Sequence, residues 1–146
     1  MPLLNAKVQA DVRKAMEGMA APVKLIMFTQ AAQALECEMC AETRALVEEV
    51  AALAPAGKLT LEVKDFLVDT AAVEAYKIDK IPAIAIVGAK DYGIRFYGIP
   101  AGYEFSSLMD DIVTVSKGES GLAAATKAAV AKINKPVHIQ VFTTPT

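Results

Sequence analysis

The 146-residue chain has only two cysteines, one histidine, no tryptophan and no cluster of lysines and arginines. The cysteines lie so close together that a bond between them closes a very small loop, which excludes a fold stapled by disulfides. The lack of a basic cluster argues against nucleic acid as a partner. A zinc site needs four ligands, and His138 is far from both cysteines in the sequence, so we expect no metal site within one chain.

Long apolar runs are missing as well. No stretch approaches the roughly 18 residues that a membrane helix requires. Residues 1–5 also lack the basic and apolar regions of a signal peptide, so we expect a cytoplasmic protein without a membrane partner. The chain has no glycine-rich phosphate loop, and Ser106 and Ser107 have no histidine near them in the sequence for a hydrolytic triad. We therefore expect no bound cofactor.

Apolar residues make up 54% of the chain and the net charge is −2, which suits one domain with a proper core. Apolar periodicity predicts helices over 6–17, 38–54, 70–76 and 103–116, the first of them capped by Asn5. It predicts strands over 23–29, 59–66, 83–87 and 94–97. This order of elements is typical of the α/β thioredoxin-like fold, a central mixed sheet flanked by helices, here with an extra N-terminal helix.

The C-terminal segment repeats part of the beginning. Pro22-Val-Lys-Leu-Ile-Met-Phe-Thr29 is similar to Pro136-Val-His-Ile-Gln-Val-Phe-Thr143, and a helical pattern precedes each copy. We expect a helix over 120–133 and a strand over 137–142, with a thioredoxin-like domain over 1–117 and the start of a second, truncated unit over 118–146. The alternative is a coincidence between two apolar strands.

Both cysteines belong to one unit, Cys37-Glu-Met-Cys40, which follows a strand and opens a predicted helix. The positive end of the helix dipole and its free N–H groups favour a thiolate, so this arrangement predicts a dithiol redox site. Cys37, nearer to solvent, is the predicted nucleophile, and Cys40, one turn further in, is the predicted resolving thiol. The alternative is a pair of small buried apolar residues without redox activity.

Two acidic residues, Glu36 and Glu38, flank Cys37. Acids near the start of a helix ordinarily stabilise it. Because a negative neighbour also raises the pKa of a thiol, both residues are candidates for tuning the nucleophile. Met39, between the cysteines, is expected on the inner face of the helix as a gap-filler.

Ile81-Pro82 is the second landmark, because it precedes a predicted strand and follows a short helix and a turn. In a thioredoxin-like fold a cis proline at this point packs against the dithiol. The residue before it, here Ile81, offers backbone groups to a bound peptide. We therefore predict Ile81 and Pro82 as substrate-binding residues beside Cys37; the alternative is a trans proline that ends a turn.

Several segments together make the chain resemble a known family, the glutaredoxin-like protein disulfide oxidoreductases of hyperthermophilic archaea and some bacteria. These segments are Pro22-Val-Lys-Leu-Ile-Met-Phe28, Tyr76-Lys-Ile-Asp-Lys-Ile-Pro82, Phe96-Tyr-Gly-Ile-Pro-Ala-Gly-Tyr-Glu-Phe105 and Val141-Phe-Thr-Thr-Pro-Thr146. The resemblance implies two thioredoxin-fold units, the first with its dithiol at Cys37 and Cys40. In the family the Thr-Pro-Thr run is followed by a second dithiol, and this sequence ends before it.

The resemblance also implies thiol–disulfide exchange on protein substrates, with a thioredoxin-reductase-like protein as a possible electron donor. The family usually has polar and aromatic residues where this chain has Glu38 and Met39. An alternative function is a redox-inactive docking or dimerisation module, with residues 137–142 as an edge strand that pairs either within the chain or with a second copy. An iron–sulfur glutaredoxin is disfavoured, because Gly88-Ala-Lys-Asp91 stands where its Gly-Gly-Ser/Thr-Asp segment belongs.

Overall fold

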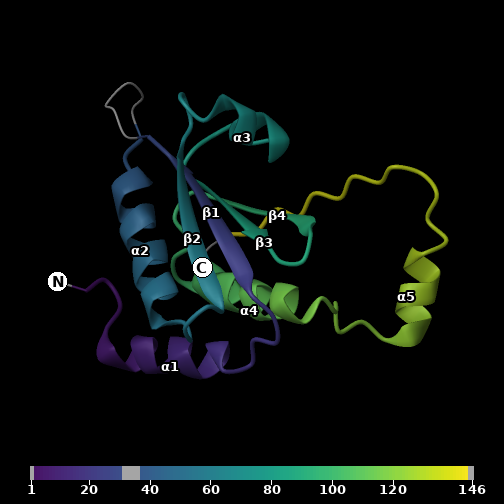
Figure 1. Cartoon of the computed structure of the whole chain (residues 1–146). Helices are drawn as coiled ribbons and strands as arrows, with labels where there is room; N and C mark the ends of the chain where they lie inside the picture. The colour runs from purple at the N-terminus through teal and green to yellow at the C-terminus, as the bar shows by residue number, and fades with distance from the viewer. Residues whose placement is uncertain (1, 31–36, 145–146) are drawn as a thin grey trace.

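A computed structural model of the chain describes residues 2–30 and 37–144, and in this part the backbone forms one four-stranded sheet (Figure 1). Its strands are β1 (Val23–Thr29), β2 (Leu59–Asp65), β3 (Ala83–Val87) and β4 (Asp91–Tyr97), in the spatial order β2-β1-β3-β4. β1 pairs with β2 in parallel, whereas β1–β3 and β3–β4 are antiparallel. The predicted mixed sheet of the thioredoxin-like α/β fold is therefore confirmed.

Helices cover both faces of the sheet. The helices α1 (Ala6–Met16), α2 (Cys40–Leu53) and α4 (Tyr103–Lys117) share a large core with one face, whereas α3 (Thr70–Ala75) packs on the other. Successive side chains of a strand point to opposite faces. In β1, Leu25 and Met27 accordingly join the large core, while Ile26 and Phe28 join the smaller one under α3. The continuous apolar run of β1 thus reflects a strand buried on both faces.

Individual residues at the ends of α1 and α4 explain where these helices begin and end. Asn5 precedes α1, and its side-chain oxygen accepts a hydrogen bond from the Val8 backbone N–H at 3.0 Å, which confirms the predicted cap. Gly118 ends α4 in the left-handed conformation, with φ of 66°, which a glycine adopts without steric cost. β4 begins at Asp91, three residues before the predicted start, and a register shift interrupts its pairing with β3 between Ala85 and Val87.

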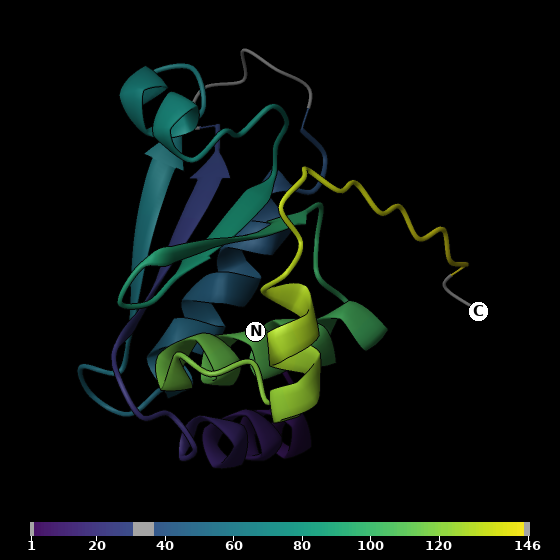
Figure 2. The ribbon, with the colours of Figure 1, turned by 90° about the vertical axis from the view of Figure 1, so that its right-hand side faces the viewer.

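The C-terminal segment differs from the prediction. Its helix, α5 (Ala124–Val130), is shorter than the predicted 120–133, and the predicted strand over 137–142 does not form in the described part of the chain. Figures 1 and 2 show the chain after α5 as an extended segment that does not join the sheet, and its last described residues, Thr143 and Thr144, line a cavity together with residues 101–104. A strand needs a partner strand for its backbone hydrogen bonds, and none of the four strands in the described part of the chain pairs with residues 137–142. Whether residues 118–146 begin a second unit stays a prediction.

Among the described residues, no helix combines the length and the apolar character that crossing a membrane requires.

An ion pair on β4 ties this strand to the end of α3. The Arg95 guanidinium donates to both carboxylate oxygens of Asp91, at 2.9 and 2.6 Å, and its Nε donates to the Tyr76 carbonyl at 3.1 Å. The hydrogen bonds from Arg95 are the main reason that the pKa of Asp91 lies below its ordinary value. Burial acts in the opposite direction, and the hydrogen bond from the Gly93 N–H lowers the pKa further. The charged carboxylate is therefore the form that stabilises the fold.

The substitution Asp91→Asn is expected to lower the free energy of unfolding at pH 7 by about 1 to 2 kcal/mol, because a charge-assisted, partly exposed pair is lost. Since the pKa of Asp91 is depressed in the folded chain, its contribution is fully present above the ordinary carboxyl pKa of about 3.9 and is lost as the pH falls through the folded value. Urea unfolding of parent and variant at pH 7 and pH 3 measures both effects.

The control is Asp79→Asn, which removes an exposed pair with Lys80 and should change stability little at either pH. A variant Asp91→Asn as stable as the parent at pH 7, or a difference that persists unchanged at pH 3, would contradict this account of the pair.

Candidate redox site

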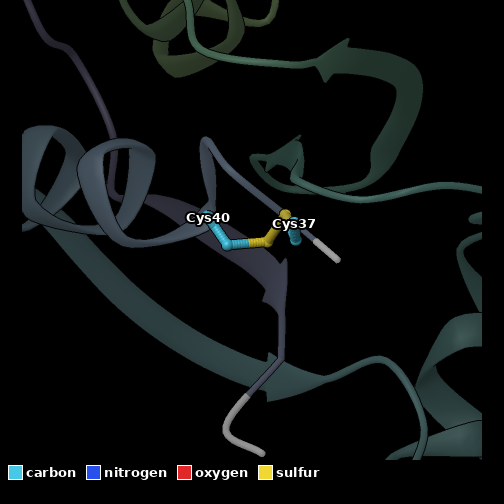
Figure 3. The surroundings of a disulfide bond; sticks show 2 residues. All are labelled: Cys37 and Cys40. Carbon is cyan, nitrogen blue, oxygen red and sulfur yellow. A yellow bond between two sulfur atoms is a disulfide. The ribbon is translucent and has the colours of Figure 1, made fainter. Parts of the chain in front are cut away.

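The two cysteines form a disulfide at the N-terminal end of α2, with an S–S distance of 1.99 Å and 5.5 Å between their Cα atoms (Figure 3). Cys37 precedes the helix, residues 38 and 39 form a turn, and Cys40 is the first helical residue. The helix therefore begins two residues later than the predicted start at Glu38. The turn reverses the chain so that the Cys40 N–H donates to the Cys37 carbonyl at 3.4 Å.

Cys37 and Cys40 differ in their exposure to solvent. Cys37 is half-buried, whereas Cys40 is only 4% exposed and belongs to the interior. A cysteine can attack a disulfide in another molecule only if that molecule can reach the cysteine's sulfur atom. Cys37 is thus the more accessible of the two cysteines.

A shallow cavity of about 320 Å³ opens beside Cys37. Its lining comes from three places in the chain: the turn before α2, the residues just before β3 and the residue just after β4. The lining residues are Cys37, Glu38, Met39, Ile81, Pro82 and Gly98. The Ile81–Pro82 peptide bond is cis, and the Pro82 carbonyl accepts a hydrogen bond from the Gly98 N–H at 2.9 Å. The fold thus brings the dithiol and the proline landmark together at one cavity.

Other predicted and unpredicted residues complete this surface. Met39 is 40% exposed at the mouth of the cavity rather than on the inner face of α2, because residues 38 and 39 lie in the turn before the helix. Glu38 is exposed there too, and its effect on the thiol stays a prediction, while Glu36 lies outside the described residues. Gly98 was not predicted; its φ of 81° directly after β4 is the signal of a required glycine.

A buried polar residue in the first turn of α2 was also missed. Thr43, in the first turn of α2, is fully buried, and its hydroxyl oxygen has no hydrogen-bond partner within the described residues. Nothing in the sequence distinguishes this threonine from others in helices, because its isolation depends on the packing of the whole domain.

No group of three or more histidine, cysteine, aspartate or glutamate side chains is arranged to hold a metal ion within residues 2–30 and 37–144. His138 lies in the exposed segment after α5.

Comparison with known proteins supports this description. No family model matches the chain, and no curated protein matches it either. Among solved structures, a protein disulfide oxidoreductase from Aeropyrum pernix has 29% identity over 88% of this chain, with a TM-score of 0.75. The N-terminal domain of the alkylhydroperoxide reductase AhpF from Enterococcus faecalis has 25% identity over 87% of this chain, with a TM-score of 0.76.

A second structure of the Enterococcus faecalis AhpF protein, solved for a point mutant, has 25% identity over 90% of this chain and a TM-score of 0.77. The alignments cover 54%, 59% and 62% of these three structures, so this chain spans less than two thirds of each. The resemblance to protein disulfide oxidoreductases that the sequence indicated is confirmed. Together with the Cys37–Cys40 disulfide, these neighbours support an oxidoreductase that works by thiol–disulfide chemistry.

Proposed function

We propose that this chain exchanges thiols and disulfides with protein substrates through Cys37 and Cys40. The observation that carries the proposal is the disulfide at the start of α2. Its half-buried cysteine, Cys37, lines a cavity together with Ile81 and Pro82. A structural disulfide would be expected to link distant parts of the chain, whereas this one spans a single turn.

The first half of the reaction occurs at Cys37. In the reduced protein the Cys37 thiolate attacks one sulfur of a substrate disulfide, forming a mixed disulfide and releasing the other substrate sulfur as a thiolate that takes up a proton. The partial positive charge of the α2 N-terminus lies one short turn away and favours the attacking thiolate.

The second half occurs at Cys40. Its thiolate attacks the Cys37 sulfur, which forms the Cys37–Cys40 disulfide and releases the substrate as a dithiol after protonation. The substrate gains two electrons and two protons in total, and the chain's dithiol supplies them. A dithiol reductant then reduces Cys37–Cys40 by the same exchange, and a thioredoxin-reductase-like protein is our proposed electron donor.

The cavity explains how a polypeptide substrate could be held. Met39 and Ile81 supply apolar surface to its lining, and Gly98 has no side chain that would fill the cavity. We propose that an extended peptide lies along Ile81 and Pro82, with its cysteine against Cys37. Hydrogen bonds between the peptide backbone and the backbone of Ile81 would give affinity without a strong preference for the peptide's sequence.

The proposal is tested by the turbidity assay for insulin reduction with dithiothreitol as reductant. The parent protein should accelerate precipitation over dithiothreitol alone, and parent protein whose thiols have been alkylated with N-ethylmaleimide should not. Equal precipitation rates with the parent, with the alkylated protein and with dithiothreitol alone would show that the parent has no protein disulfide reductase activity and would overturn the proposal.

A second candidate function follows from residues 137–142, where Val137, Ile139, Val141 and Phe142 are between 64% and 89% exposed. An extended apolar segment with unpaired backbone groups recruits another strand. We therefore propose dimerisation through this segment as the alternative. Sedimentation should show a dimer that Val141→Lys disrupts; a parent that stays monomeric at all concentrations would contradict it.

A further inference from the structure

Thr43 is fully buried in the first turn of α2, three residues after Cys40. Residues three apart on a helix share one face. Figure 3 shows Cys40 at the start of this helix, with its sulfur bonded to that of Cys37. The threonine therefore lies on the helix face that carries the inner sulfur.

The Thr43 hydroxyl lacks the partner that such a group ordinarily has. A threonine inside a helix commonly donates its hydroxyl to the carbonyl four residues earlier, here that of Met39. That carbonyl accepts the Thr43 backbone N–H at 2.9 Å, but among the described residues no group bonds the hydroxyl. A buried hydroxyl without a partner is costly, so a partner in another state of the protein would explain its presence.

We propose that the Thr43 hydroxyl donates a hydrogen bond to the Cys40 sulfur once the disulfide is reduced. The inference rests on the proposed function of the dithiol. Reduction by a dithiol such as dithiothreitol transfers two electrons and two protons, breaks the S–S bond and leaves two thiols, while dithiothreitol becomes its cyclic disulfide. The Cys40 side chain is then free to change its χ1 rotamer, and its sulfur, above all as a thiolate, accepts hydrogen bonds better than a disulfide sulfur does.

Two consequences follow for the reaction. The hydrogen bond exists only in the reduced protein, so it favours the dithiol over the disulfide and makes the pair a stronger oxidant. It also stabilises the Cys40 thiolate, which is the form that attacks the mixed disulfide. Thr43 is thus a positioning residue for the resolving step, behind the sulfur that substrates do not reach.

The test compares Thr43→Val, which keeps the shape and removes the hydroxyl, with Thr43→Ser, which keeps the hydroxyl. Each protein is equilibrated with mixtures of reduced and oxidised dithiothreitol, quenched in acid and then alkylated. Mass spectrometry gives the fraction of protein that carries the dithiol. Thr43→Val should disfavour the dithiol about tenfold relative to the parent, equivalent to about 30 mV toward a more negative potential. Thr43→Ser should stay within about twofold of the parent, an ordinary background effect.

A second measurement separates this role from packing. Because Val removes a hydroxyl that is unsatisfied only in the disulfide form, Thr43→Val should raise the melting temperature of the oxidised protein relative to that of the reduced protein. Equal shifts in both forms, an unchanged equilibrium in Thr43→Val, or equal changes in Thr43→Val and Thr43→Ser would each overturn the inference.

The outcome is independent of substrate turnover. If the parent equilibrates with dithiothreitol and Thr43→Val shows no shift, the inference fails while the proposed function can stand. If Thr43→Val shifts the equilibrium but the parent does not reduce insulin, the inference is supported and the proposed function on protein substrates fails.

Discussion

Replacing Cys37 with serine is expected to lower the rate of insulin reduction about 100-fold or more, to the rate of dithiothreitol alone. The thiolate is the nucleophile of the exchange, and a serine hydroxyl neither ionises near neutral pH nor forms a disulfide. Cys40 cannot take over, because it is only 4% exposed in the interior at the start of α2. The measurement is the insulin assay at equal protein concentrations.

The matched control is Cys40→Ser, which removes the same number of sulfur atoms but keeps the accessible nucleophile. It should lose most turnover and still react once with a disulfide. If Cys37→Ser retained the parent rate, Cys37 would not be the attacking residue. If both variants were folded and equally unable to react even once, the different exposures of the two cysteines would have no functional meaning.

The substitution Phe28→Ala is expected to lower the free energy of unfolding by about 3 to 5 kcal/mol, the usual cost of truncating a buried phenylalanine. Phe28 is fully buried near the end of β1 in the core under α3, and its ring centroid lies 5.9 Å from that of Tyr76. Its removal leaves a cavity that the rigid sheet fills only in part. Chemical denaturation of both proteins in the oxidised form measures the difference.

Phe142→Ala is the control within the same chain, since Phe142 is 89% exposed. This variant should have nearly the parent's stability. A large loss in Phe142→Ala would show that the segment after α5 packs against the domain in solution. A negligible loss in Phe28→Ala would contradict the described core.

Much of the fold was predictable because local signals and burial agree. β1 is a continuous apolar run buried on both faces, and its predicted bounds match the structure. The Asn5 cap likewise marks the start of α1. The Cys-x-x-Cys unit stood out because it follows a strand and precedes a helix, whereas the cis form of Pro82 was expected only from the order of the elements.

The remaining features depend on tertiary contacts that a linear pattern does not contain. β4 starts early at polar, exposed residues, because pairing with β3 rather than apolar content defines it. Residues 137–142 have strand-like composition but no partner strand in the described part of the chain. The isolation of the Thr43 hydroxyl is equally a result of packing, and so is the exposure of Met39 in the turn before α2.

The central claim is that Cys37 attacks protein disulfides and Cys40 resolves the product. It is tested most directly by incubating reduced Cys40→Ser and Cys37→Ser variants with a protein disulfide and recording intact masses without reductant. The account predicts one covalent adduct on Cys40→Ser that dithiothreitol removes, and none on Cys37→Ser. No adduct on Cys40→Ser, or the same adduct on both variants, would contradict it.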